Sequence, residues 1–192
     1  MLNEFIDFVD SILPSVSPDL KDQAKAAIEQ FEIDGKQMHF LKSSTLGQLS
    51  QGDIISKVPF SFFDEKGEQI LFTANGMVIS TSCHIDNKDT IVIVPVLPIE
   101  SFEGHVDQLK KNIVYDYMYI EEGELSKQYI NFEYMNTYDS NLIINGIKEN
   151  RITKLHSLNL LGYYFFIVKL TVYLMRKEDS ETQNERFSSF IN

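Results

Sequence analysis

The stretch GMVISTSCHIDNKDTIVIVPVLPI, at residues 76–99, decides how this chain folds. Two short apolar runs, at residues 77–79 and 91–97, stand on either side of a polar segment. Both runs are rich in β-branched residues and lack polar alternation, which is typical of strands that are buried on both faces. The tripeptide Asn-Lys-Asp at residues 87–89 has turn chemistry, so we expect the two runs to pair as a hairpin.

The second strand of this hairpin contains Pro95 and Pro98, which cannot donate hydrogen bonds to a ladder. We therefore expect the strand to end or bulge at one of them. A second hairpin is predicted just upstream, with strands at residues 60–63 and 69–73. Its turn, Asp-Glu-Lys-Gly at residues 64–67, ends in a glycine that can adopt a positive φ.

Helical segments are expected at both ends of the chain. Residues 2–13 carry apolar side chains at helical spacing, and a Ser-Pro-Asp start signal opens a second helix at residues 17–31. The longest predicted helix spans residues 154–177 and is apolar on most sides, which is typical of a helix buried on most sides. Between these segments we expect a short helix at residues 103–112 and strands at residues 114–120, 129–134 and 141–147.

The chain is acidic, with 17 Lys and Arg against 28 Asp and Glu and a net charge of −11. This charge disfavours RNA as a ligand, because phosphates are repelled at long range. A basic stretch at residues 148–177 holds six basic residues against Glu149 alone. We expect it to pack against the acidic body; the alternative is a surface for an acidic protein or a nucleic acid.

A reducing cytoplasm is the simplest compartment for this chain, because one cysteine excludes an internal disulfide framework and no secretory signal is visible. No apolar run reaches the length of a membrane span, so we expect a soluble protein without membrane contact. The four histidines are far apart in sequence and match no metal-ligand spacing, so neither a metal nor a cofactor is expected.

Cys83 and His84 are neighbours, but adjacent side chains of an extended segment point to opposite faces and make a poor catalytic dyad. We therefore expect Cys83 to be a buried residue at a strand end.

Three short motifs follow one another in the central part of the chain: GDI at residues 52–54, MVIS at 77–80 and IVIVP at 91–95. This series resembles the PemK/MazF toxin family over residues 47–99. The resemblance implies a small SH3-like β-barrel. The expected fold is thus α+β, with an N-terminal helical segment (1–46), a β-barrel with a Tyr-rich β insert (47–150), and a long C-terminal helix with a polar tail (151–192).

The toxin family that this chain resembles consists of ribonucleases. Their catalytic residues are an Arg near the start of the second motif and a Thr or Ser at the end of the third. This chain has Asn75 and Gly76 where the family has its Arg-Pro step. It has Leu97, or Pro98 after a shift of one residue, where the family has its Thr. The resemblance therefore implies a fold whose usual ribonuclease site is lost.

Our leading hypothesis is a catalytically degenerate PemK/MazF-like domain that acts as a protein-binding regulatory module in a bacterial toxin–antitoxin, stress or phage-defence system. The rival is an active endoribonuclease toxin that cleaves single-stranded RNA with a relocated site built from Arg151, His84 and Asp53. A third reading is a plain structural subunit. The partner is expected to be another protein or a second copy of the chain.

Two regions are candidate partner surfaces. The first is the long helix, whose expected exposed aromatics are Tyr163, Tyr164, Phe166 and Tyr173. The second is the Tyr-rich insert, for which two readings stay open: a half-buried sheet, or an amphipathic contact surface in which tyrosines supply rigid area with a polar tip. Its tyrosines are Tyr115, Tyr117, Tyr119, Tyr129, Tyr134 and Tyr138.

Overall fold

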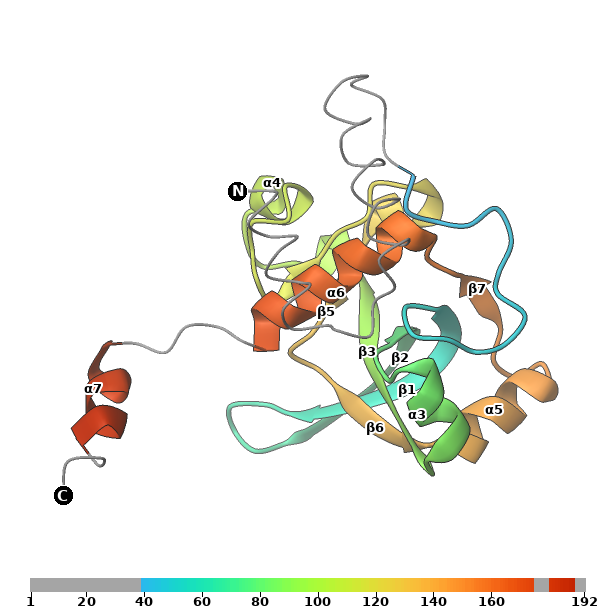
Figure 1. The fold of residues 1–192 in the computed structure, drawn as a ribbon, viewed down its shortest axis with the longest axis horizontal. Helices are drawn as coiled ribbons and strands as arrows, with labels where there is room; N and C mark the ends of the chain where they lie inside the picture. Colours follow the sequence, from blue (N-terminus) through green and yellow to red (C-terminus); the bar gives the residue numbers. More distant parts are fainter. Residues whose placement is uncertain (1–38, 175–179, 189–192) are drawn as a thin grey trace.

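The computed structural model describes residues 39–174 and 180–188. In these ranges the chain has an α+β fold built on one antiparallel sheet of seven strands, in the order β4-β5-β3-β2-β1-β7, with β6 paired to β3 beside this path. The sheet is not closed into a barrel (Figure 1). The strands are β1 (Ile54–Phe63), β2 (Gln69–Val78), β3 (Thr90–Pro98), β4 (Tyr117–Met118), β5 (Gln128–Asn131), β6 (Asn136–Asp139) and β7 (Lys154–His156).

Helices cover both faces of the sheet. The α-helices are α3 (Ser82–Asn87), α4 (Val106–Lys110), α5 (Ser140–Lys148), α6 (Leu160–Leu174) and α7 (Ser180–Ser188), with 3₁₀ turns at Ile99–Ser101 and Gly123–Lys127. Helix α6 crosses the sheet (Figure 1), and its Phe166 and Leu170 share one apolar core with strand residues such as Val94. Ile85 of α3 and Ile143 of α5 belong to a second core on the opposite face. The helices expected at residues 2–13 and 17–31 lie outside the described residues.

Both predicted hairpin pairings are confirmed. Strands β1 and β2 pair from Ile54↔Met77 to Phe63↔Gln69, and Gly67 at their turn has a φ of 78°. Strands β2 and β3 pair from Asn75↔Val96 to Val78↔Ile93. The connection between β2 and β3 is not a simple turn, because it contains α3.

Residues 82–87 form a helix because the Thr81 hydroxyl accepts a hydrogen bond from the backbone of His84, which caps the first turn. Cys83 is exposed on this helix, so the expectation of a buried strand-end cysteine is wrong.

Two further expectations about secondary structure are wrong. Residues 141–147 form α5 instead of a strand, because the Asp139 carboxylate accepts hydrogen bonds from the Asn141 and Leu142 backbones and starts a helix. The long helix begins at Leu160 instead of residue 154. Residues 154–156 form β7, which pairs with β1, and Asn159 caps the helix by accepting from Gly162 N.

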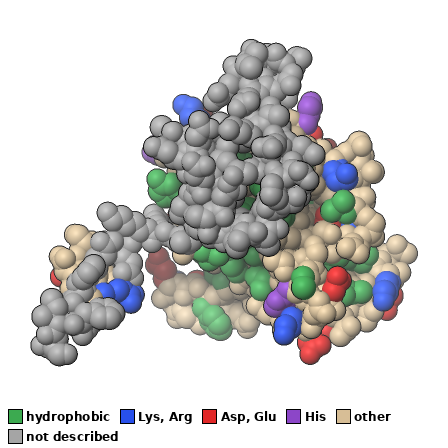
Figure 2. All heavy atoms as spheres, viewed as in Figure 1, with side chains coloured by type: hydrophobic (Ala, Val, Ile, Leu, Met, Phe, Trp, Pro, Cys, Tyr) green, Lys and Arg blue, Asp and Glu red, His purple; other side chains and the backbone are tan. Residues whose placement is uncertain are grey.

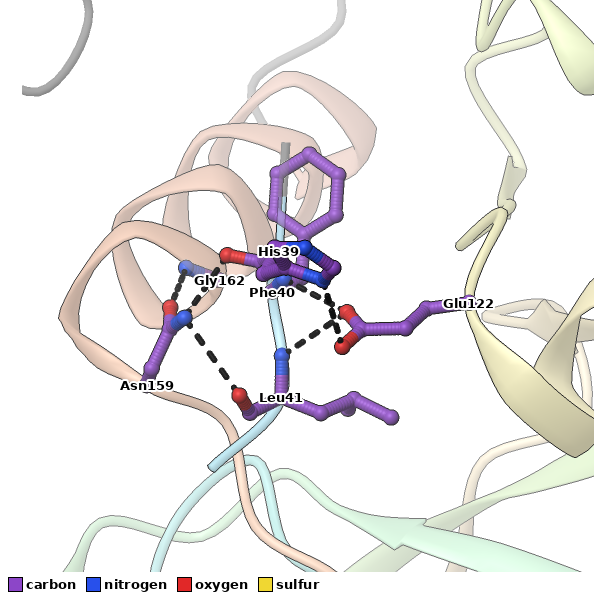
Figure 3. A network of polar contacts seen from close by, with 6 residues as sticks. All are labelled: His39, Phe40, Leu41, Glu122, Asn159 and Gly162. Carbon is purple, nitrogen blue, oxygen red and sulfur yellow. Dashed lines mark hydrogen bonds and ion pairs between the residues drawn. The ribbon is translucent and has the colours of Figure 1, made fainter. Parts of the chain in front are cut away.

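Figure 3 shows how the start of the described chain is held against α6 and the 3₁₀ turn near Glu122. The Glu122 carboxylate accepts hydrogen bonds from the Phe40 and Leu41 backbones at 2.7 and 3.1 Å, and its Oε1 lies 3.3 Å from His39 Nδ1. Asn159 donates to the His39 carbonyl oxygen at 2.7 Å. Gly162 permits this close approach, because a Cβ there would collide with the carbonyl oxygen of Phe40.

Candidate functional site

A large hollow in the described part of the chain lies where β2 and β3 separate. The two strands pair only through residues 75–78 of β2, and beyond Val96 strand β3 continues alongside β5. This divergence leaves an open groove with a volume of about 1130 Å³. Residues from β1, β2, β3 and β5 line it, together with the segment that leads into α4.

Aromatic side chains form both walls of the groove. They are Phe62, Phe72, Phe102, Tyr117, Tyr129 and Tyr134. On one wall the rings of Phe102, Tyr117 and Tyr129 meet edge to face, with centroids 5.2 to 5.5 Å apart. On the other wall Phe62 stacks on Tyr134 at 4.4 Å. Rings held in this way offer rigid contact area at a small loss of side-chain entropy.

The charged groups of the groove are mostly acidic. Among its described lining residues, Glu103, Asp116 and Glu133 carry carboxylates, Lys57 carries the single ammonium group, and His105 adds an imidazole. Tyr117 Oη donates a 2.6 Å hydrogen bond to Glu133. Burial and the Glu133 carboxylate raise the pKa of Tyr117, so its hydroxyl stays protonated at neutral pH. The groove therefore suits a neutral or cationic ligand better than an anionic one.

Lys169 of α6 supports the wall that carries Val114 and Asp116. The residue is only 5% exposed, and its Nζ donates to the carbonyl oxygens of Asn112 and Val114 at 3.1 and 2.7 Å. Burial lowers the pKa of Lys169 to about 8, while Asp116 opposes this shift. Lys169 thus links the helix to a groove-lining segment.

Asp53, one of the three predicted catalytic residues, is completely buried beside β7. Its carboxylate accepts hydrogen bonds from Ser157 Oγ at 2.5 Å and Ser50 N at 2.9 Å, and it forms a 3.2 Å ion pair with Lys154. These contacts tie the segment before β1 to β7. A carboxylate in this setting stabilises the fold and is shielded from a substrate.

The other two catalytic candidates lie on different elements. Arg151 precedes β7 and forms a 2.7 Å ion pair with Glu149 at the surface, and His84 belongs to α3. Within the described residues, no hydrogen bond or ion pair connects Arg151, His84 and Asp53. Cys83 is also exposed on α3, where Asn87 Nδ2 lies 3.5 Å from its sulfur. The same ranges hold no cluster of side chains suited to a metal ion.

The expected partner-binding aromatics on α6 differ in their surroundings. Phe166 is completely buried in the core, which corrects the expectation that it is exposed. Tyr163 is half-buried and its hydroxyl lies 3.0 Å from Gln51 Oε1, while its ring meets that of Tyr164 edge to face. The Tyr173 ring packs 5.7 Å from that of Phe132. A partner-binding role for the three tyrosines stays a prediction.

Part of the basic stretch at residues 148–177 is used inside the fold, as expected. Lys154 pairs with Asp53 and Lys169 is buried, whereas Arg151 pairs at the surface with Glu149 of the same stretch. On the face seen in Figure 2, the described charged side chains lie scattered and form no continuous basic patch.

The sequence points to half of the groove's aromatic residues but not to the groove itself. The Tyr-rich insert drew attention to Tyr117, Tyr129 and Tyr134, and these three line one cavity with Phe62 and Phe102. These two and Phe72 were not expected at a site, because phenylalanine in or near a strand is ordinary core composition. A signal was present in Pro98, since a proline at a strand end marks a point where pairing stops.

No protein-family model matches the chain, and no curated protein matches it. In the described residues, none of the helices combines the length and apolar character needed to cross a membrane.

Proposed function

We propose that this chain is a non-enzymatic, protein-binding regulatory module, and that its binding site is the aromatic groove between β2 and β3. One observation carries the proposal: aromatic side chains wall an open groove of about 1130 Å³ whose charged lining residues are predominantly acidic. Such a groove fits an extended segment of another protein, with apolar side chains between the rings and polar ones toward solvent.

The positions where the PemK/MazF resemblance would place catalytic groups support this proposal. Asn75, Leu97 and Pro98 all line the groove, although more than 20 residues separate Asn75 from the other two. If the chain is a distant relative with an opened SH3-like barrel, the former site faces the groove without its Arg and Thr. The proposed setting is accordingly a bacterial toxin–antitoxin, stress or phage-defence system in the cytoplasm.

The rival hypothesis of a relocated ribonuclease site receives less support. Asp53 is buried in an ion pair and cannot reach a substrate hydroxyl without breaking that pair. The acidic groove also repels phosphates, since three carboxylates line it against one ammonium group.

The test is selection of a displayed random-peptide library on the purified protein. Wild type is compared with Tyr134→Ala, which removes the ring stacked on Phe62, and with Tyr115→Ala. Tyr115 belongs to the same insert, is 51% exposed and does not line the groove, so it is a matched control. We expect enriched peptides to bind wild type and the control, and to bind Tyr134→Ala at least about tenfold more weakly.

A third variant, Tyr164→Ala, separates the groove from the helix surface. Peptides that lose binding to Tyr164→Ala but bind Tyr134→Ala normally would move the site to α6. A selection that yields no specific peptide would contradict the proposal altogether.

A further inference from the structure

The groove contains an unpaired strand edge. Strand β2 pairs with β1 from Gln69 to Met77 around one bulge, but it pairs with β3 only at residues 75–78. Among the described residues, the remaining outer edge of β2, residues 69–74, pairs with no strand. This edge runs along the groove, because Ile70, Phe72 and Thr73 are among its lining residues.

The contacts of β1 show which backbone groups of β2 face the groove. Ser61 uses both its N–H and its C=O to bond the Asn136 side chain, at 2.8 and 3.1 Å, on the side away from β2. The Pro59 carbonyl oxygen likewise accepts from Tyr138 Oη at 2.6 Å. Two residues that lie opposite each other in an antiparallel ladder either exchange N–H···O=C hydrogen bonds or both direct their N–H and C=O groups away from each other. Leu71, opposite Ser61, and Thr73, opposite Pro59, therefore direct their N–H and C=O groups away from β1, toward the unpaired edge of β2. Thr73 lines the groove, and Leu71 lies two residues before it on the same edge.

Pro98 explains why β3 does not cover this edge. Ile79 N donates to the Val92 oxygen, so Asn75 and Val96 form a bonded pair in the same register. The next bonded pair would join Thr73 to Pro98, and proline has no N–H to donate. The ladder ends there and β3 continues with β5 alone.

The two edges of the β1–β2 hairpin differ in their protection. The β1 edge carries Pro59, a bulge near Lys57, and the Asn136 contacts, all of which block strand pairing. The β2 edge reads Gln-Ile-Leu-Phe-Thr-Ala and contains neither a charge nor a proline. Leu71 on this edge is 72% exposed. An apolar edge of this kind is open to strand addition.

We propose that the partner segment binds by strand addition: a basic, extended peptide pairs its backbone with Leu71 and Thr73 of β2. This inference rests on the proposed function of the groove and specifies its ligand. Backbone bonds to the edge supply affinity that is independent of sequence, and the aromatic walls receive the side chains on the inner face of the peptide. The side chains on the other face of the peptide, at every second position, reach the acidic groups of the groove.

The charge of the lining selects a basic peptide. Glu103, Asp116 and Glu133 lie along the groove, and among the described residues Lys57 supplies the only ammonium group of its lining. Lysine or arginine at every second position of the peptide brings cations to these carboxylates. A second copy of this chain is the less suitable occupant, because its net charge of −11 opposes self-association.

The probe is a capped octapeptide in which valine alternates with lysine, with a valine–glutamate octapeptide as the control for charge. We expect the lysine peptide to slow amide hydrogen exchange at Leu71 and Thr73, measured by NMR, and the glutamate peptide to have no effect. Two N-methylated versions, each blocking alternate N–H groups, test the backbone contacts. The version whose methyl groups replace the N–H groups that face β2 should bind about tenfold more weakly, and the version methylated on the opposite edge should bind normally.

Protein variants provide a second readout. Thr73→Pro removes one N–H that faces the groove and leaves the ladder with β1 intact, because the Pro59–Thr73 pair is not a bonded one. Glu65→Pro is the matched control, since Glu65 is the second residue of the hairpin turn, where proline is favoured. We expect Thr73→Pro to weaken binding roughly tenfold and Glu65→Pro to leave it unchanged, with both variants folded by circular dichroism.

Each other outcome overturns a defined part of the account. Binding that tolerates both N-methylated peptides and leaves the two amides unprotected overturns strand addition but keeps the groove as the site. Equal binding of the glutamate peptide overturns the choice of a basic ligand. Concentration-dependent protection of Leu71 and Thr73 without peptide makes a second copy the occupant. If the library selection yields no peptide whose binding is weakened by Tyr134→Ala, the proposed function itself is overturned.

Discussion

Replacing Lys169 with methionine should change how the stability of the protein depends on pH. Lys169 is buried, and its pKa is lowered from 10.5 to about 8. Above about pH 8 the folded protein loses this proton while the unfolded chain keeps it up to about pH 10.4, so the unfolded state binds more protons. The free energy of unfolding therefore rises with pH across this window. Between about pH 7.5 and 10 the rise amounts to about 2 kcal/mol.

Tyrosines act in the opposite direction at higher pH. Burial raises the pKa values of Tyr129 and Tyr138, so the folded state holds protons more tightly than the unfolded chain above about pH 10. Their effect is the same in wild type and in Lys169→Met. The difference between the two proteins, taken at each pH, therefore isolates Lys169.

The assay is urea unfolding at about pH 7.5 and 10 for wild type, Lys169→Met and Lys66→Met, where Lys66 is an exposed residue of the β1–β2 turn. We expect the wild-type free energy of unfolding to gain about 2 kcal/mol relative to that of Lys169→Met as pH rises, and Lys66→Met to follow wild type. Parallel pH dependence in wild type and Lys169→Met would refute the burial of a charged lysine beneath the groove wall.

Three further outcomes follow from particular contacts. Gly162→Ala should cost about 2 kcal/mol in urea unfolding, because its Cβ collides with the Phe40 carbonyl, and an unchanged midpoint would contradict that packing. Asp53→Asn should cost about 3 kcal/mol by leaving Lys154 unpaired, and adding Lys154→Met should recover part of this loss; an additive double variant would argue against the ion pair. Wild type should leave single-stranded RNA intact, whereas sequence-dependent cleavage by nuclease-free protein would revive the ribonuclease hypothesis.

The parts of the fold that the sequence predicts well are those where local pattern and tertiary packing agree. The apolar runs of β2 and β3 are buried on both faces, as their composition indicates, and Gly67 takes the positive φ that its turn requires. Helix α5 was missed because Ile143 and its neighbours read equally well as a strand. The deciding contact is the cap at Asp139, a single side chain before the apolar residues.

The groove was harder to predict, because its walls come from segments that are distant in sequence. Phe62 of β1 stacks on Tyr134, which follows β5, and no local pattern shows that these rings meet. The role of Lys169 could not be predicted either. In the sequence it only interrupts an apolar run, and its burial depends on the carbonyl groups of Asn112 and Val114. Tertiary contacts of this kind leave no periodic signal.

An NMR titration of the labelled protein with the valine–lysine octapeptide shows whether the partner binds in the groove between β2 and β3. We expect the largest chemical-shift changes at Leu71 and Thr73 of the strand edge and at Tyr129 and Tyr134 of the walls. Changes confined to Tyr163, Tyr164 and Tyr173 of α6 would contradict it, and so would a spectrum that the peptide leaves unchanged.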